Sequence, residues 1–130
     1  MTEAKIILTP FQNAVRSLED ILTEPFSVIV RDATIQRFEY TFELAIKMMM
    51  RVLEAMPSAP DLDRMPFRDM IRLAAEAGLV TDPETWFGYR DARNMTSHAY
   101  DEKKAELVFE AAKRFTKNAR LLCDALEKRV

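Results

Sequence analysis

The only histidine of the chain, His98, lies in a short segment that also holds an arginine and a tyrosine, Arg93 and Tyr100. An arginine can bind a phosphate with its planar guanidinium, and a histidine can move a proton near neutral pH. These residue types suit chemistry at a phosphodiester, with Arg93 on the phosphate and His98 as general base or acid at a ribose 2′-hydroxyl. Tyr100 adds a hydroxyl that could itself be modified.

Two neighbours extend this candidate site. Arg90 lies three residues before Arg93, so the two guanidinium groups share one face of a helix. Asn94 and His98 are four residues apart and share a face if the helix continues that far. An alternative interpretation is purely structural: Arg93 pairs with a nearby carboxylate, Asp91 or Glu39, and His98 caps a helix end.

A second stretch, residues 37–47, carries charges on two sides of a predicted helix. Arg37 lies on one side, while Glu39, Glu43 and Lys47 form a ladder on another. Glu43 and Lys47 have the favourable order for a surface pair, worth about 0.2–0.5 kcal/mol. A solvated face is one interpretation; the other places Glu39 or Arg37 beside Arg93 and His98 as an orienting or ligand-binding group.

Composition excludes several classes of site and protein. One histidine and one cysteine do not supply a zinc set, and the two glycines, ten residues apart, do not form a phosphate-binding loop. We therefore expect no metal and no other cofactor. The formal charge of −2 means that any RNA contact must be local. No apolar run is long enough to span a bilayer, so we expect a cytoplasmic protein without a membrane contact.

The elements that position these groups are helices, because apolar residues recur at steps of three and four and no segment alternates with period two. A chain of 130 residues predicts one domain over residues 1–130. Short connections predict an all-α, antiparallel up-and-down four-helix bundle with a short accessory helix. The expected helices start at Thr9-Pro10, Ser27, near Phe67, at Asp82-Pro83 and at Asp101, with an earlier start of the first helix at Ile7 or Leu8 as an alternative. The expected stops include Pro25, Pro57 and a left-handed Gly78.

The segment from Arg93 to Tyr100 resembles the Arg-x4-His-x-Tyr motif of the HEPN superfamily. Residues 37–47 are similar to the second-helix signature of its nucleotidyltransferase substrate-binding branch, which includes HepT-like chains. The resemblance runs over most of the chain. It implies a four-helix bundle, usually a homodimer, similar to the helical domain of kanamycin nucleotidyltransferase. It also implies a separate minimal nucleotidyltransferase chain as partner.

Related members of the superfamily act as toxins in toxin–antitoxin pairs. The resemblance implies that Arg93 and His98 of two protomers would face a shared cleft and cleave RNA without a metal. It further implies that the partner would silence such a toxin by transferring AMP to Tyr100. Asn94 matches the Arg-Asn start of the motif.

Three hypotheses for the function follow. In the first, the chain is the helical substrate- and partner-binding subunit of a two-chain minimal nucleotidyltransferase system and holds a nucleotide or phosphate-bearing ligand in a dimer cleft. The ligand- or partner-binding residues would be Arg37, Glu39, Glu43, Arg90 and Asn94. In the second, it is an RNase toxin in which Arg93 and His98 are catalytic and Tyr100 is the site of modification. In the third, it is a dimeric helical adaptor in which the motif only stabilises the bundle.

Overall fold

The computed structural model describes residues 5–130 and contains helices and turns but no strand within that range. The expected all-α class is confirmed. The expected domain span includes residues 1–4, which lie outside the described residues. The helices are α1 (Thr9–Ile21), α2 (Val28–Glu54), α3 (Phe67–Glu76), α4 (Pro83–Met95) and α5 (Glu102–Glu127), with short 3₁₀ turns η1 (Leu62–Arg64) and η2 (Thr96–His98).

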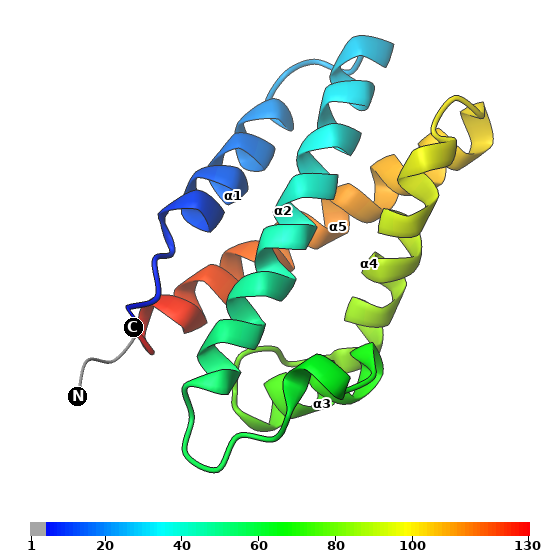
Figure 1. Cartoon of the computed structure of the whole chain (residues 1–130). Helices are drawn as coiled ribbons and strands as arrows, with labels where there is room; N and C mark the ends of the chain where they lie inside the picture. Colours follow the sequence, from blue (N-terminus) through cyan, green and yellow to red (C-terminus); the bar gives the residue numbers. More distant parts are fainter. Residues whose placement is uncertain (1–4) are drawn as a thin grey trace.

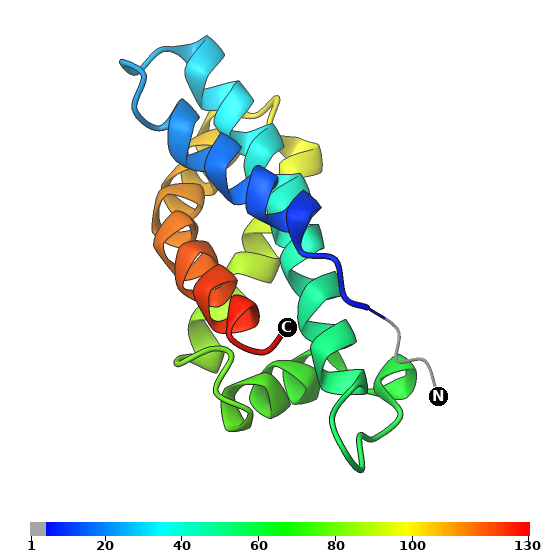
Figure 2. The same ribbon diagram turned by 90° about the vertical axis from the view of Figure 1, so that its left-hand side faces the viewer.

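Four long helices surround the core, and α3 is the short accessory helix (Figure 1). A short turn joins α1 to α2, and the two helices lie side by side with opposite chain directions (Figures 1 and 2). The last helix, α5, crosses behind α2 and α4 at an oblique angle and contacts α1 as well. The loop with η1 leads into α3 at the foot of α2, and α4 then returns along α2 toward its N-terminal end (Figure 1).

An aromatic cluster centred on Phe115 of α5 joins these helices. Its ring centroid lies 5.2 Å from that of Phe38 on α2, and 5.6 and 5.1 Å from those of Trp86 and Tyr89 on α4. Phe38, Trp86 and Phe115 are fully or almost fully buried. Each such side chain contributes about 1.5–3 kcal/mol through burial, so the cluster fixes α4, and with it the Arg93 segment, against α2 and α5.

Local signals set the helix ends largely as expected. The side chain of Ser27 accepts a hydrogen bond from the Val30 amide, and that of Asp101 accepts one from the Lys104 amide. Gly78 has a φ of 81° and ends α3, with the Leu79 amide donating to the Ala74 carbonyl. This hydrogen-bond pattern is a Schellman cap, which favours glycine at the left-handed position.

The expected cap of α1 is wrong. Leu8 is the N-cap residue, it makes no side-chain cap, and Thr9 and Pro10 lie inside the first turn. Leu8 is buried and packs into the hydrophobic core. Burial of the Leu8 side chain therefore shifts the start of the helix by one residue from the position that the hydroxyl of Thr9 would favour.

Two further expectations concern burial and membranes. Cys123 is free and fully buried on α5, as predicted, and desolvation raises the pKa of its thiol to about 11. No helix within the described residues is long and apolar enough to cross a bilayer.

Candidate functional site

Arg93 lies in the last turn of α4 and points toward two carboxylates on α2. Its Nη2 donates a hydrogen bond to Oε1 of Glu43 and lies 3.8 Å from Oε1 of Glu39. The contact with Glu43 raises the pKa of Arg93. The carboxylates are four residues apart, so they lie on one face of α2. The Arg93 side chain remains 32% exposed, so the guanidinium is held in place yet open to a ligand.

These contacts decide between the pairings that the sequence left open. Glu39 is a neighbour of Arg93, as one interpretation had it, whereas Asp91 forms no ion pair with Arg93 among the described residues. The expected surface pair between Glu43 and Lys47 is absent from residues 5–130, because Glu43 binds Arg93 across the α2–α4 contact instead.

A hollow of about 300 Å³ opens beside Arg93. This volume is at the small end of the range for ligand pockets. Apolar side chains from α2 and α3 form part of the wall, and Arg90 and Asn94 of α4 lie on the same rim as Arg93. The full lining is Phe42, Glu43, Ile46, Phe67, Arg90, Arg93 and Asn94. Two guanidinium groups and an amide at one opening suit a phosphate-bearing ligand.

His98 and Tyr100 follow the end of α4 rather than continuing it. The α-helix stops at Met95, and η2 covers Thr96 to His98. Thr96 helps to end the helix, since its hydroxyl donates to the Arg93 carbonyl at 2.8 Å. Asn94 and His98 are therefore not joined by a continuous α-helical turn, which was the condition for their sharing a face.

The imidazole of His98 and the phenol of Tyr100 are neighbours. Nδ1 of His98 lies 3.5 Å from the Tyr100 hydroxyl, at the outer limit of a hydrogen bond. Both side chains are exposed, and Tyr100 is 83% exposed. The hydroxyl of Tyr100 is thus accessible to a modifying enzyme, and the imidazole is accessible to a substrate.

Arg37 lies away from this group. Its Nη1 donates to the Ser17 carbonyl at 2.6 Å, so the side chain faces α1. Tyr40 and Thr41 lie on the same side, since their hydroxyls contact the Ser17 hydroxyl and the Ala14 carbonyl. The structure therefore brings together Glu39, Glu43, Arg90, Arg93 and Asn94, but places Arg37 in the α1–α2 interface.

One charged residue near the site was not predicted from the sequence. Arg31 of α2 is only 5% exposed and donates to Glu102 at the start of α5, at 2.7 and 3.4 Å. The contact lowers the pKa of Glu102, which is two residues from Tyr100. Arg31 thus joins the starts of α2 and α5 beside the Tyr100 segment. Its position four residues before Ile35 on the apolar face of α2 was the available signal.

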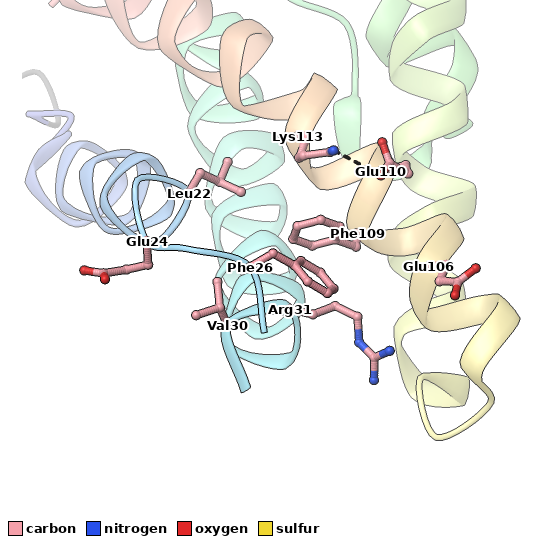
Figure 3. A pocket seen from close by; sticks show the side chains of 9 residues that line it. All are labelled: Leu22, Glu24, Phe26, Val30, Arg31, Glu106, Phe109, Glu110 and Lys113. Carbon is pink, nitrogen blue, oxygen red and sulfur yellow. Dashed lines mark ion pairs between the residues drawn. The ribbon is translucent and has the colours of Figure 1, made fainter. Parts of the chain in front are cut away.

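A second cavity, of about 590 Å³, lies between the α1–α2 turn and the first half of α5 (Figure 3). Phe26 and Phe109 form an apolar wall with ring centroids 5.5 Å apart, and Lys113 pairs with Glu110 at the rim. None of Arg93, His98 and Tyr100 lines this cavity. His98 and Tyr100 do not line the hollow beside Arg93 either, so it is Arg93, with Arg90 and Asn94, that makes this hollow the better candidate for the functional site.

Over residues 7–128 the chain matches the family described as "Nucleotidyltransferase substrate binding protein like". The chain belongs to this family. It is 38% identical to the probable ribonuclease HepT of Haemophilus influenzae over 96 residues, which are 73% of this chain and 66% of that relative. The chain thus spans slightly less than two thirds of that curated relative.

Solved structures agree with the family. A Haemophilus influenzae protein with the fold of a substrate binding domain of a nucleotidyltransferase superposes with a TM-score of 0.83 at 30% identity, covering 93% of this chain and 99% of that one. A Thermus thermophilus protein superposes with a TM-score of 0.78, also at 30% identity, covering 89% of this chain and 98% of that one. The expected membership of the nucleotidyltransferase substrate-binding branch is confirmed.

Proposed function

We propose that this chain is the helical substrate- and partner-binding subunit of a two-chain nucleotidyltransferase. The observation that carries the proposal is the hollow beside Arg93, in a chain of the substrate-binding family. The partner would be a separate minimal nucleotidyltransferase chain. The described chain would bind a nucleotide or another phosphate-bearing ligand and present it to that enzyme.

The charges of the hollow suggest how the ligand binds. A phosphate would bind Arg90 and Arg93 and displace Glu43 from Arg93, because two anions would repel each other at one guanidinium. Glu39 lies farther from the guanidinium, at 3.8 Å, and would compete with the phosphate more weakly than Glu43. The amide of Asn94 on the same rim would donate a further hydrogen bond to the ligand.

We further propose that the working unit is a homodimer. Each copy has a single Arg93 and a single His98, both at least partly exposed near the end of α4. A second copy facing this end would double the positive groups around one ligand and exclude water from it. A shared cleft of this kind strengthens each charge interaction, because the effective dielectric constant falls when water is excluded.

Co-purification with a minimal nucleotidyltransferase tests the proposed subunit role. The two chains are expected to co-elute, and the pair is expected to retain a phosphate-bearing acceptor that Arg93→Gln releases. Arg16→Gln on α1 removes the same charge far from the hollow and is the matched control. Failure of the chains to associate, together with ligand binding that is unchanged in Arg93→Gln, would contradict the proposal.

A second candidate function is metal-independent RNA cleavage. It is favoured by the similarity to a probable ribonuclease HepT and by the exposed imidazole of His98, five residues after Arg93 in the sequence. In this scheme His98 takes the proton from a ribose 2′-hydroxyl, whose oxygen attacks the adjacent phosphorus. The bond to the 5′-oxygen breaks, that oxygen takes up a proton, and Arg93 stabilises the charge on the phosphate.

Tyr100 would control this activity as part of a toxin–antitoxin pair. The partner would transfer AMP from ATP to the Tyr100 hydroxyl, releasing pyrophosphate. The hydroxyl is 3.5 Å from the His98 ring, so an attached nucleotide would crowd the imidazole. Wild-type protein free of AMP is expected to cleave RNA, and His98→Ala to lose cleavage while Tyr100→Phe retains it but escapes silencing. Intact RNA with the unmodified wild-type protein would refute this candidate.

A further inference from the structure

The outer surface of α3 and α4 carries arginines stacked on aromatic rings. The guanidinium carbons of Arg68 and Arg72 lie 4.6 and 5.4 Å from the ring centroid of Phe87. That of Arg90 lies 4.5 Å from the centroid of Phe67. The two rings are themselves 6.4 Å apart, so the stacked groups form one continuous array. We call these five residues the arginine–aromatic surface.

The charge of this surface is only partly compensated. Arg72 has a carboxylate of Asp69 at 3.5 Å. Within residues 5–130, neither Arg68 nor Arg90 forms an ion pair, although both side chains are exposed. A chain with a net charge of −2 therefore has a local positive surface here. Such a surface attracts a polyanion even when the protein as a whole is slightly acidic.

The arginine–aromatic surface is continuous with the candidate site. Phe67 and Arg90 belong to it and also line the hollow that contains Arg93 and Asn94. From Phe87 to Arg93 the rise along α4 is about 9 Å, at about 1.5 Å per residue. A ligand longer than one nucleotide that enters the hollow would thus extend over the stacked arginines.

We propose that the arginine–aromatic surface binds single-stranded RNA that enters the hollow at Arg93. A guanidinium placed over a ring can present its outer face to a base while its edge donates hydrogen bonds to phosphate. Proteins that bind single strands recurrently combine positive charge along the backbone with planar groups on which bases stack, and arginine adds cation–π contributions; here the exposed arginines would supply both, because the Phe87 ring beneath them is buried. The RNA class rests on the second candidate function, but binding is independent of cleavage and can be measured alone.

Fluorescence anisotropy with a labelled single-stranded RNA oligomer, repeated over a range of salt concentrations, tests the proposal. Arg68→Gln/Arg90→Gln is expected to weaken binding about tenfold or more, because stacking and phosphate contacts are both lost. At about 0.7 for each phosphate contact, the slope of log affinity against log salt should fall by about 1.4. Arg68→Lys/Arg90→Lys should keep the slope but bind more weakly, since an ammonium does not stack.

A matched control is Arg16→Gln/Lys117→Gln, which removes two exposed cations from α1 and α5. Its salt slope is expected to stay close to that of the wild type. Equal loss of affinity in this control and in Arg68→Gln/Arg90→Gln would overturn the proposal. If Arg68→Lys/Arg90→Lys binds RNA as tightly as the wild type, bases do not stack on these guanidinium groups and that part of the proposal is wrong.

The remaining outcomes separate this proposal from those above. If Arg68→Gln/Arg90→Gln loses association with a nucleotidyltransferase but binds RNA normally, the surface belongs to the protein partner and the proposal is wrong. If His98→Ala binds RNA like the wild type and neither protein cleaves it, the proposed RNA cleavage is wrong, but RNA binding by the arginine–aromatic surface is supported. If the wild type cleaves RNA but Arg68→Gln/Arg90→Gln binds RNA normally, RNA binding by the arginine–aromatic surface is wrong, but the proposed cleavage is supported.

Discussion

Replacing Glu43 with glutamine is expected to strengthen phosphate binding at Arg93. Glu43 occupies the guanidinium in the free protein, so a phosphate must displace it. The Glu43 side chain is 52% exposed, which limits such an ion pair to about 0.2–1 kcal/mol. Glu43→Gln removes that competition, and affinity should rise by about 1.4- to 5-fold. The free energy of unfolding should fall by no more than about 1 kcal/mol.

Calorimetric titration with inorganic triphosphate measures the affinity directly. Glu39→Gln, which removes the more distant carboxylate at 3.8 Å, should give a smaller increase. Glu110→Gln on α5 causes the same change in net charge away from the hollow and should leave the affinity close to the wild-type value. Arg93→Gln should abolish the binding, both alone and combined with Glu43→Gln.

Two results would refute this reasoning. Weaker triphosphate binding in Glu43→Gln would mean that the carboxylate orients Arg93 for the ligand rather than competing with it. An increase no larger than that of Glu110→Gln would mean that only the net charge of the protein matters.

Three further predictions concern the frame that holds the site. Because burial raises the pKa of Cys123 to about 11, iodoacetamide should alkylate this thiol slowly at about pH 8 in the native protein and quickly in urea; equal rates would contradict its burial. Arg31 lowers the pKa of Glu102. The ion pair therefore stabilises the fold at pH values above the ordinary pKa of a glutamate, about 4.3, and this stabilisation is lost as the pH falls through the lowered pKa. The urea midpoints of the wild type and Glu102→Gln should differ at about pH 7 and converge in acid. Phe115→Ala should cost about 3–5 kcal/mol in urea unfolding, and a loss below about 1 kcal/mol would contradict its central place in the aromatic cluster.

Helix ends could be predicted from the sequence wherever the signal is local. Ser27, Gly78 and Asp101 act within one turn of their own positions, so neighbouring residues suffice to identify them. Thr9 failed because the start of α1 depends on burial of Leu8 in a core assembled from distant residues.

The candidate site could be predicted only in part for the same reason. The sequence places Arg90, Arg93 and Asn94 together because they lie within about one turn of one helix. The partner of Arg93 depends on the contact between α2 and α4, which brings Glu43 from 50 positions away in the sequence. Spacing along α2 put Arg37 on another side from Glu39 and Glu43 but left open a place beside Arg93, and its side chain lies on the face that packs against α1.

The burial of Arg31 was not predicted from the sequence, because a charged residue is expected at a core position only when a partner that neutralises it is known. Glu102 is 71 positions away, and no pattern within α2 points to it. The arginine–aromatic surface likewise forms only when α3 packs against α4.

The central claim, a substrate- and partner-binding role, is tested most directly by the rate of nucleotide transfer catalysed by a minimal nucleotidyltransferase. Adding the wild-type chain is expected to raise that rate, and adding Arg93→Gln is expected to leave it near the level of the enzyme alone, although the two chains still associate. An unchanged rate with the wild-type chain, or an equal rise with Arg93→Gln, would contradict the claim.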